Sequence, residues 1–142
     1  MLSLCAGIGG LDLGIELATN GRSRVVGYVE RDPFAAAILV ARMEDKAMDR
    51  APIWDDLESF DGSSWRGNVD LVSAGFPCQP FSTASGRPPR AEDDHRWVWP
   101  SIKAIIRDVQ PALVFLENVP GILVRGFGRV LGDMAALGFD AQ

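Results

Sequence analysis

Short apolar runs alternate with segments of helical periodicity along the chain. The apolar runs, which we interpret as strands, occupy residues 2–5, 25–29, 52–54, 69–74 and 112–116. The periodic segments predict helices at residues 11–18, 33–43, 99–109 and 129–137. Strands and helices that alternate in this way predict an α/β fold, in which a parallel sheet is covered by helices on both faces.

Local signals support several of these boundaries. Asp32 and Pro33 are typical of an N-cap followed by the first helical position, and Asn20-Gly21 is a typical helix stop. The charged residues 44–50 are expected to form a solvated helix end, and residues 139–142 look like the start of a further strand. Residues 75–96 form a loop far longer than the usual ~4–6 residues, and long loops are commonly functional or mobile.

Composition narrows the class of protein. The 142 residues suit one domain, and the 47% hydrophobic and 23% charged shares are ordinary for a soluble globular protein. No apolar run approaches the ~18 residues of a membrane span, and no secretory signal is present. Cys5 and Cys78 match no zinc spacing, so we expect reduced thiols in a cytoplasmic protein that holds no metal. The net charge of −5 argues against a sequence-independent nucleic-acid binder, which is expected to be basic.

Four features with chemical potential each follow a predicted strand. They are the glycine-rich turn at residues 5–10, Glu30, the loop that begins at Gly75, and Glu117. In an open parallel sheet, ligands bind beyond the carboxyl ends of the strands. We therefore expect these features to gather on one rim of the sheet.

The glycine-rich turn and Glu30 together indicate a nucleoside-containing cofactor. Glycines let the backbone turn sharply and approach a ligand closely, and an acid about 20 residues further on binds ribose hydroxyls. The turn lacks the full G-x-G-x-x-G spacing, so these residues do not separate a nicotinamide cofactor from S-adenosylmethionine. Asp55-Asp56 follows a third strand, where an acid could accept from an adenine amino group or only cap a helix.

Cys78 is the candidate nucleophile. It lies between Pro77 and Pro80, and each proline restricts the backbone beside it. A thiolate is a strong nucleophile, and a loop position makes it accessible. The alternative is that Cys78 is a small buried hydrophobe, as lone cysteines commonly are.

Four segments resemble motifs of the DNA (cytosine-5) methyltransferase family and occur in that family's order. They are Leu4–Leu11 (LCAGIGGL), Tyr28–Asp32 (YVERD), Gly75–Ser82 (GFPCQPFS) and Leu116–Val119 (LENV). The third is the most specific, and the first departs from the family, which usually has Phe where Cys5 stands. The resemblance implies a Rossmann-like fold of the S-adenosylmethionine-dependent methyltransferase type, with residues 1–142 forming a catalytic core that is incomplete at its C-terminus.

The resemblance also implies catalytic roles. Cys78 attacks carbon-6 of a cytosine, Glu117 holds or protonates ring nitrogen-3 and exocyclic nitrogen-4, and carbon-5 then takes a methyl group from S-adenosylmethionine. Arg96 lies in a stretch that resembles the family's Asp-x-Arg-Gly, although Trp97 replaces the glycine, and it is a candidate for orienting the base or the Cys78 loop.

The cofactor residues follow from the same resemblance. The turn cradles the methionine part, Glu30 binds the ribose, Asp56 meets the adenine (with Asp55 as the second choice), and Pro77 lies near the methyl donor. The full set of expected cofactor residues is Cys5, Ala6, Gly7, Ile8, Gly10, Glu30, Arg31, Asp56, Leu57 and Pro77.

The implied partner is double-stranded DNA with its target cytosine flipped out of the duplex, and the implied setting is a restriction–modification system with a cognate endonuclease. The family's target recognition region and its later motifs are missing from the 142 residues, which accounts in part for the acidic charge and predicts that this piece alone binds DNA weakly or is inactive. Three alternatives remain: a tRNA cytosine-5 methyltransferase, a nicotinamide-dependent oxidoreductase, and an inactive domain that only binds cofactor or a partner.

Overall fold

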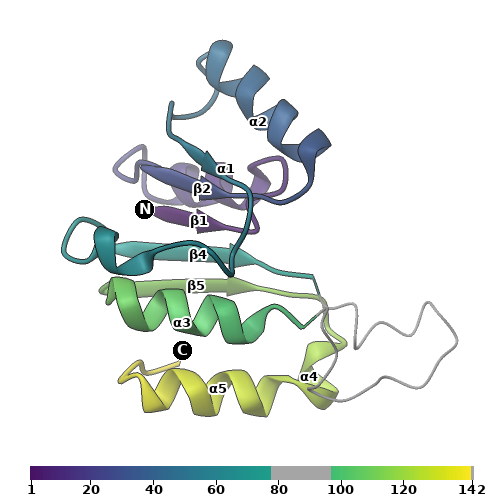
Figure 1. Ribbon diagram of the computed structural model, residues 1–142, viewed down its shortest axis with the longest axis vertical. Coiled ribbons are helices and arrows are strands. Elements are labelled where there is room, and N and C mark those ends of the chain that lie inside the picture. Colours follow the sequence, from purple (N-terminus) through teal and green to yellow (C-terminus); the bar gives the residue numbers. More distant parts are fainter. Residues whose placement is uncertain (78–96, 142) are drawn as a thin grey trace, which may run out of the picture.

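A computed structural model describes residues 1–77 and 97–141 (Figure 1). Five parallel strands form one sheet in the order β3-β2-β1-β4-β5. The strands are β1 (Leu2–Leu4), β2 (Gly27–Val29), β3 (Ile53–Trp54), β4 (Leu71–Gly75) and β5 (Leu113–Glu117). The helices are α1 (Gly10–Ala18), α2 (Pro33–Glu44), the 3-10 helix η1 (Gly62–Trp65), α3 (Trp99–Val109), α4 (Ile122–Arg125) and α5 (Phe127–Ala136).

The predicted α/β class and the parallel sheet are confirmed. The one-turn elements η1 and α4 were not predicted, because a single turn has no periodicity to recognise. The charged stretch 44–50 does not continue α2, which ends at Glu44, and Lys46 adopts a left-handed φ of 58°.

The strand expected at residues 139–142 was wrong for its described part, 139–141. After α5 the chain reverses at Gly138, whose φ is 91°. The amide of Phe139 donates to the carbonyl of Met134 at 3.0 Å, and the amide of Gly138 donates to Ala135 at 3.0 Å. Because this cap uses the Phe139 amide, that group is not available to a strand ladder.

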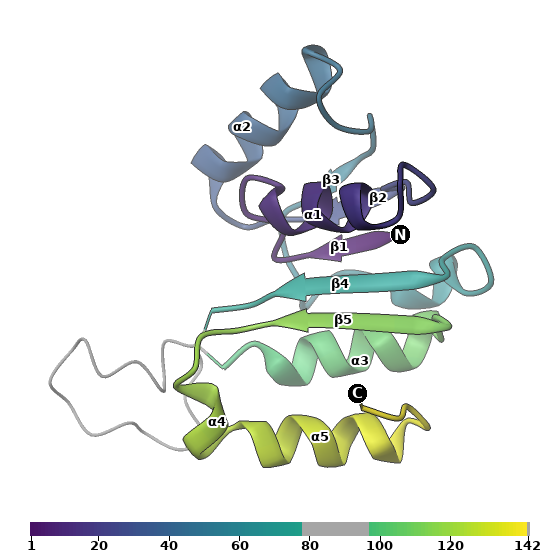
Figure 2. The ribbon, with the colours of Figure 1, turned by 180° about the vertical axis from the view of Figure 1, so that it is seen from behind.

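Helices cover both faces of the sheet (Figures 1 and 2). Side chains alternate between the faces along each strand, as the strand period requires. One face carries α3 and η1, and its strands contribute the buried residues Leu2, Leu4, Val29, Val72 and Ala74. The opposite face carries α1 and α2, and Tyr28 packs there with Leu39 and Met43 of α2.

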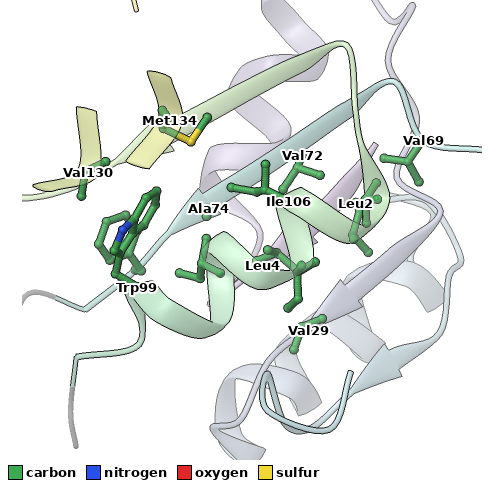
Figure 3. Close-up of a cluster of buried hydrophobic side chains, with 14 of the residues drawn as sticks. Leu2, Leu4, Val29, Val69, Val72, Ala74, Trp99, Ile106, Val130 and Met134 are labelled. Carbon is green, nitrogen blue, oxygen red and sulfur yellow. The ribbon is translucent and has the colours of Figure 1, made fainter. Parts of the chain in front are cut away.

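The larger core is centred on α3 and Trp99 (Figure 3). Trp99 is 1% exposed and lies beside Val130 and Met134 of α5. Its indole nitrogen donates to Asp133 at 2.8 Å, and Lys103 reaches the same carboxylate at 2.5 Å. This shared acceptor joins α3 to α5 at the edge of the apolar core.

Asp12 fastens the start of α1 to the sheet. Its carboxylate is 2% exposed and accepts hydrogen bonds from Ser3 of β1 at 2.8 Å and from Ser73 of β4 at 3.0 Å. Burial raises the pKa of this carboxyl above its usual value, and the two serine hydroxyls only partly offset the rise. The contact fixes the helix that follows the glycine-rich turn to the central strand β1 and its neighbour β4.

We expect Asp12→Ala to lower the free energy of unfolding by about 1–3 kcal/mol, because two buried hydroxyls lose their acceptor. Asp12→Asn is the matched control, since its amide can still accept from one serine and donate to the other. Because the folded-state pKa of Asp12 is raised, the stability linked to its protonation is lost as pH rises through that pKa, and Asp12→Asn removes this dependence. Urea unfolding at several pH values measures both effects, and equal stability of the two variants would contradict the assignment.

β5 is the edge strand of the described sheet, yet its first four residues are all apolar. Leu113 is 64% exposed and Phe115 is 49% exposed, whereas strands of parallel sheets are usually buried on both faces. A groove of about 760 Å³ runs beside this strand, between it and α5, and reaches Glu117 and Asn118 at one end.

In the described residues, none of the helices is long and apolar enough to cross a bilayer.

Candidate active site

The parallel register brings to one rim those predicted site residues that follow or end the described strands. All five strands run in the same direction, so their carboxyl ends lie along the same edge of the sheet (Figure 1). The turn at residues 5–10 follows β1, Glu30 follows β2, Gly75 ends β4 and Glu117 ends β5. Asp55, which follows β3, lies at the same edge. The expectation that these features share a rim is met.

The glycine-rich turn is held by backbone hydrogen bonds at both ends. The amide of Ala6 donates to Val29 at 3.1 Å, and the amide of Gly9 donates to Ala6 at 2.9 Å. Gly7 and Gly9 have φ values of 55° and 82°, in the left-handed region that favours glycine. The turn therefore needs glycines at these two positions.

Arg42 of α2 also anchors the turn, and sequence analysis did not identify it. Its guanidinium donates to the carbonyl of Ile8 at 2.6 Å across 34 residues of sequence. The Ile8 side chain is 46% exposed, so the contact holds the backbone while that side chain stays accessible. No local pattern signals this contact, because it depends on how α2 packs.

Glu30 closes the turn from the second strand. One carboxylate oxygen accepts the amide of Gly7 at 2.6 Å, and the other accepts the amide of Asp32 at 2.7 Å. A carboxylate has about four lone-pair sites, so it keeps acceptor capacity for further donors. Glu30 thus couples the glycine-rich turn to the N-terminus of α2 and can still receive hydroxyl groups.

The turn leaves room for a ligand on its open side. A Cβ atom built on Gly7 or on Gly10 would meet no atom within 4 Å. A group with hydroxyls can therefore approach the backbone here, beside the free lone pairs of Glu30. The open backbone and the remaining acceptor capacity of Glu30 suit a ligand that carries hydroxyl groups.

Cys5 does not have the character of a nucleophile. Burial, together with the nearby Glu30 carboxylate, raises the pKa of its thiol to about 12. Its φ of 52° places it in the left-handed region, at the first bend after β1. The Cys5 thiol therefore stays protonated at neutral pH, and the role of Cys5 is structural, as part of the turn.

Asp56 caps its own turn. Its carboxylate accepts the amide of Ser59 at 3.0 Å and that of Glu58 at 3.3 Å. Hydrogen bonding by Ser59, then by Glu58, with a smaller contribution from the charge of Arg31, holds the pKa of Asp56 below its usual value. Asp56 is thus an ionised acceptor beyond β3, and Leu57 beside it packs partly against the larger core.

Glu117 projects over the end of the neighbouring strand. It pairs in register with Gly75, and its side chain is exposed. A Cβ atom placed on Gly75 would lie 3.5 Å from a carboxylate oxygen of Glu117 and 3.8 Å from a methyl group of Leu11. The carboxylate and the first helical turn after the glycines therefore face the same point of the rim.

Phe76 and Pro77 follow the end of β4 and precede Cys78 in the sequence. Phe76 is 4% exposed and packs near Trp97 and Trp99, with ring centroids 6.1 and 5.7 Å away. Pro77 is exposed at the end of the described segment. Cys78 and Arg96 lie outside the described residues, so their expected roles rest on the sequence.

Asn118, like Arg42, has a role at the site that no sequence pattern indicated. It belongs to the Leu116–Val119 motif, but nothing in the sequence indicates which atom its side chain meets. Its amide nitrogen donates to the carbonyl of Phe76 at 2.8 Å.

Among the residues with described positions, no cluster of His, Cys, Asp or Glu is arranged to hold a metal.

The five-stranded parallel sheet and the helices on both of its faces form a Rossmann-like α/β fold. DNMT2 from Spodoptera frugiperda superposes with a TM-score of 0.67 at 18% identity, over 96% of this chain and 40% of that one. A putative RNA methyltransferase from Pyrococcus horikoshii superposes with a TM-score of 0.55 at 17% identity, over 92% of this chain and 52% of that one. At these identities the likeness concerns the fold alone.

The chain belongs to the C-5 cytosine-specific DNA methylase family, whose model matches residues 1–139. It is 37% identical to the type II methyltransferase M.PspPI of a Psychrobacter species, over 92% of this chain and 30% of that protein. It is 33% identical to the type II methyltransferase M.NgoMIV of Neisseria gonorrhoeae, over 99% of this chain and 43% of that protein. The chain thus spans less than half the length of these relatives.

Proposed function

We propose that the complete protein transfers a methyl group from S-adenosylmethionine to carbon-5 of cytosine in DNA. One observation carries the proposal: the Glu117 carboxylate and the first turn of α1 both lie close to Gly75, at the end of β4. Gly75 precedes Cys78 by three residues in the sequence. Family membership supports DNA as the substrate class. The match to type II methyltransferases supports a restriction–modification role alongside a cognate endonuclease.

S-adenosylmethionine fits the turn and the acids beside it. Gly7 and Gly10 leave the backbone open to its amino-acid part, and Glu30 has acceptor capacity for the ribose hydroxyls. Asp56, beyond β3, accepts from the adenine amino group, with Arg31 nearby. When bound, the cofactor supplies the electrophilic methyl group that carbon-5 of cytosine receives.

Cys78 and Glu117 then act together on an extruded cytosine. The Cys78 thiolate forms a bond to carbon-6, and the electron pair of the carbon-5–carbon-6 double bond moves toward nitrogen-3. Glu117 provides the proton or hydrogen bond at nitrogen-3, so carbon-5 becomes an enamine-like nucleophile. Cys78 follows β4 by three residues in the sequence and Glu117 ends the neighbouring strand β5, so the proposal gives the two groups the proximity that the reaction needs.

The covalent bond is broken in the second half of the reaction. Once carbon-5 carries the methyl group, its proton leaves to a solvent base and the carbon-5–carbon-6 double bond forms again. Cys78 is expelled as a thiolate, and the nitrogen-3 proton returns to Glu117. The base must be flipped out of the duplex for any of these atoms to reach the rim.

Radiolabelled methyl transfer tests this proposal on the complete protein. With labelled S-adenosylmethionine we expect label in duplex DNA, recovered after digestion as 5-methylcytosine, and none in tRNA. Label found only in tRNA would move the substrate to RNA. Absence of transfer to either polymer, with the cofactor shown to bind, would refute the methyltransferase proposal.

We expect Glu30→Ala to weaken S-adenosylmethionine binding at least about 10-fold, because a charged acceptor for hydroxyl and amide donors is lost. Titration calorimetry on the complete protein measures the dissociation constant. Glu44→Ala is the matched control, since Glu44 is exposed at the far end of α2, about 18 Å of helix away.

A cofactor analogue separates direct contact from an effect on the turn. If Glu30 binds the ribose, the affinity difference between S-adenosylhomocysteine and its 2′-deoxy form should shrink in Glu30→Ala. An undiminished difference would show that Glu30 acts only by holding Gly7.

A further inference from the structure

Asn118 continues the pairing of β4 and β5 beyond the last backbone rung. The register of the two strands ends with Gly75 opposite Glu117, and the next pair in sequence is Phe76 and Asn118. Here the Asn118 side chain donates to the carbonyl of Phe76 at 2.8 Å. A side-chain amide thus takes the place of a ladder hydrogen bond where the two strands begin to separate.

The orientation of the Asn118 amide is set by both of its ends. Its oxygen accepts the amide of Val119 at 2.9 Å, which leaves the nitrogen facing Phe76. A flipped amide would put two oxygens against each other at the Phe76 carbonyl and two donors against each other at Val119. Asn118 is half-buried, so the bond is partly shielded from water.

The bonded carbonyl belongs to the peptide bond between Phe76 and Pro77. Pro77 has no amide hydrogen and its φ is restricted by the ring, so a fixed Phe76 carbonyl fixes the plane from which the chain continues. The Phe76 ring is held at the same time by Trp97 and Trp99. Asn118 therefore ties the peptide immediately before Pro77-Cys78 to the residue immediately after Glu117.

We propose that Asn118 is a positioning residue that sets the approach of Cys78 to the base relative to Glu117. The inference rests on the proposed function and adds a residue to it. Asn118 acts through the Phe76 carbonyl and needs no contact with the substrate. A displacement of about 1 Å at a reacting group can lower a rate about 10²-fold, so losing this bond should slow the covalent step while leaving cofactor binding intact.

The test compares Asn118→Asp and Asn118→Ala in the complete protein. The first keeps the side-chain shape but replaces the donor by an acceptor that faces the Phe76 carbonyl, and the second only removes the donor. We expect the rate of adduct formation on DNA containing 5-fluorocytosine to fall at least about 10-fold in both, and further in the aspartate variant. The dissociation constant of S-adenosylmethionine should change by less than about twofold, because the cofactor residues are untouched.

Asn68→Asp is the matched control. The Asn68 amide also donates to a backbone carbonyl, that of Arg66 at 3.4 Å, but it lies before β4, at the opposite end of that strand from the rim. This variant should form the adduct at the wild-type rate. If either Asn118 variant also keeps the wild-type rate, the inference fails and the proposed function stands.

Thermal melting and cofactor titration distinguish positioning from a general loss of structure. A slower adduct rate that is matched by lower cofactor affinity and a lower melting temperature would overturn the positioning role. If Asn118→Asp does not fold, the comparison of Asn118→Ala with wild type decides. A wild-type protein that binds cofactor but gives neither adduct nor methyl transfer would instead refute the proposed function.

Discussion

Cys78→Ser is expected to abolish the covalent adduct with DNA that contains 5-fluorocytosine. In this substrate carbon-5 carries fluorine in place of the proton that must leave, so the enzyme remains bonded to carbon-6 after methyl transfer. A serine hydroxyl is a far weaker nucleophile than a thiolate at neutral pH, and we expect methyl transfer to fall at least about 10³-fold. Denaturing electrophoresis of the complete protein with labelled DNA measures the adduct.

Peptide mapping of the wild-type adduct provides the internal control. The chain has two cysteines, and burial and the Glu30 charge raise the pKa of the Cys5 thiol to about 12. The adduct should therefore map to the peptide that contains Cys78. An adduct that persists at full yield in Cys78→Ser, or that maps to Cys5, would show that the nucleophile was assigned wrongly.

Glu117→Gln is expected to lower the rate of methyl transfer by about 10²–10⁴-fold, the usual contribution of a general acid or base. Glutamine has the same shape and reach, but it cannot deliver a proton to nitrogen-3. Glu117 lies on the exposed end of β5, while the cofactor residues follow other strands, so the affinity for S-adenosylmethionine should change little. Single-turnover kinetics with saturating cofactor and DNA measure the chemical step directly.

Glu44→Gln is the matched control for that measurement. It makes the same chemical change at an exposed position at the end of α2 and should leave the rate unchanged. If Glu117→Gln reacts at the wild-type rate, Glu117 has no part in the chemistry. If its defect lies wholly in cofactor affinity, Glu117 belongs to the cofactor site and our division of roles is incorrect.

The local sequence predicted most of the secondary structure because each element carries its own signal. The N-cap expected at Asp32 is present, with its carboxylate accepting from Phe34 at 2.8 Å and Ala35 at 3.1 Å. The buried strand expected at residues 69–74 is β4, displaced by one or two residues. The expected strand at residues 139–142 failed over 139–141, because apolar character alone does not show whether an amide is already used by a helix cap.

The residues of the candidate site also fall into two groups, those that local sequence patterns indicated and those that only the packing of the chain revealed. Glycines, an acid after the second strand, and the cysteine and glutamate motifs are visible as residue types at fixed spacings, so Glu30 and Glu117 could be placed on the rim in advance. Arg42 and Asn118 could not, because each meets a backbone carbonyl more than thirty residues away. Such contacts depend on packing and register, which no local window contains.

The amino-acid sequence by itself determined the α/β class, the order of the five strands and the four longer helices, and the family, because hydrophobic periodicity and short motifs are local properties of the chain. Only the tertiary structure decided that Glu30 binds the Gly7 amide, that Glu117 reaches over Gly75, and that Asn118 holds the peptide before Pro77. These contacts arise from the parallel register of β1, β2, β4 and β5, which brings distant strand ends together on one rim.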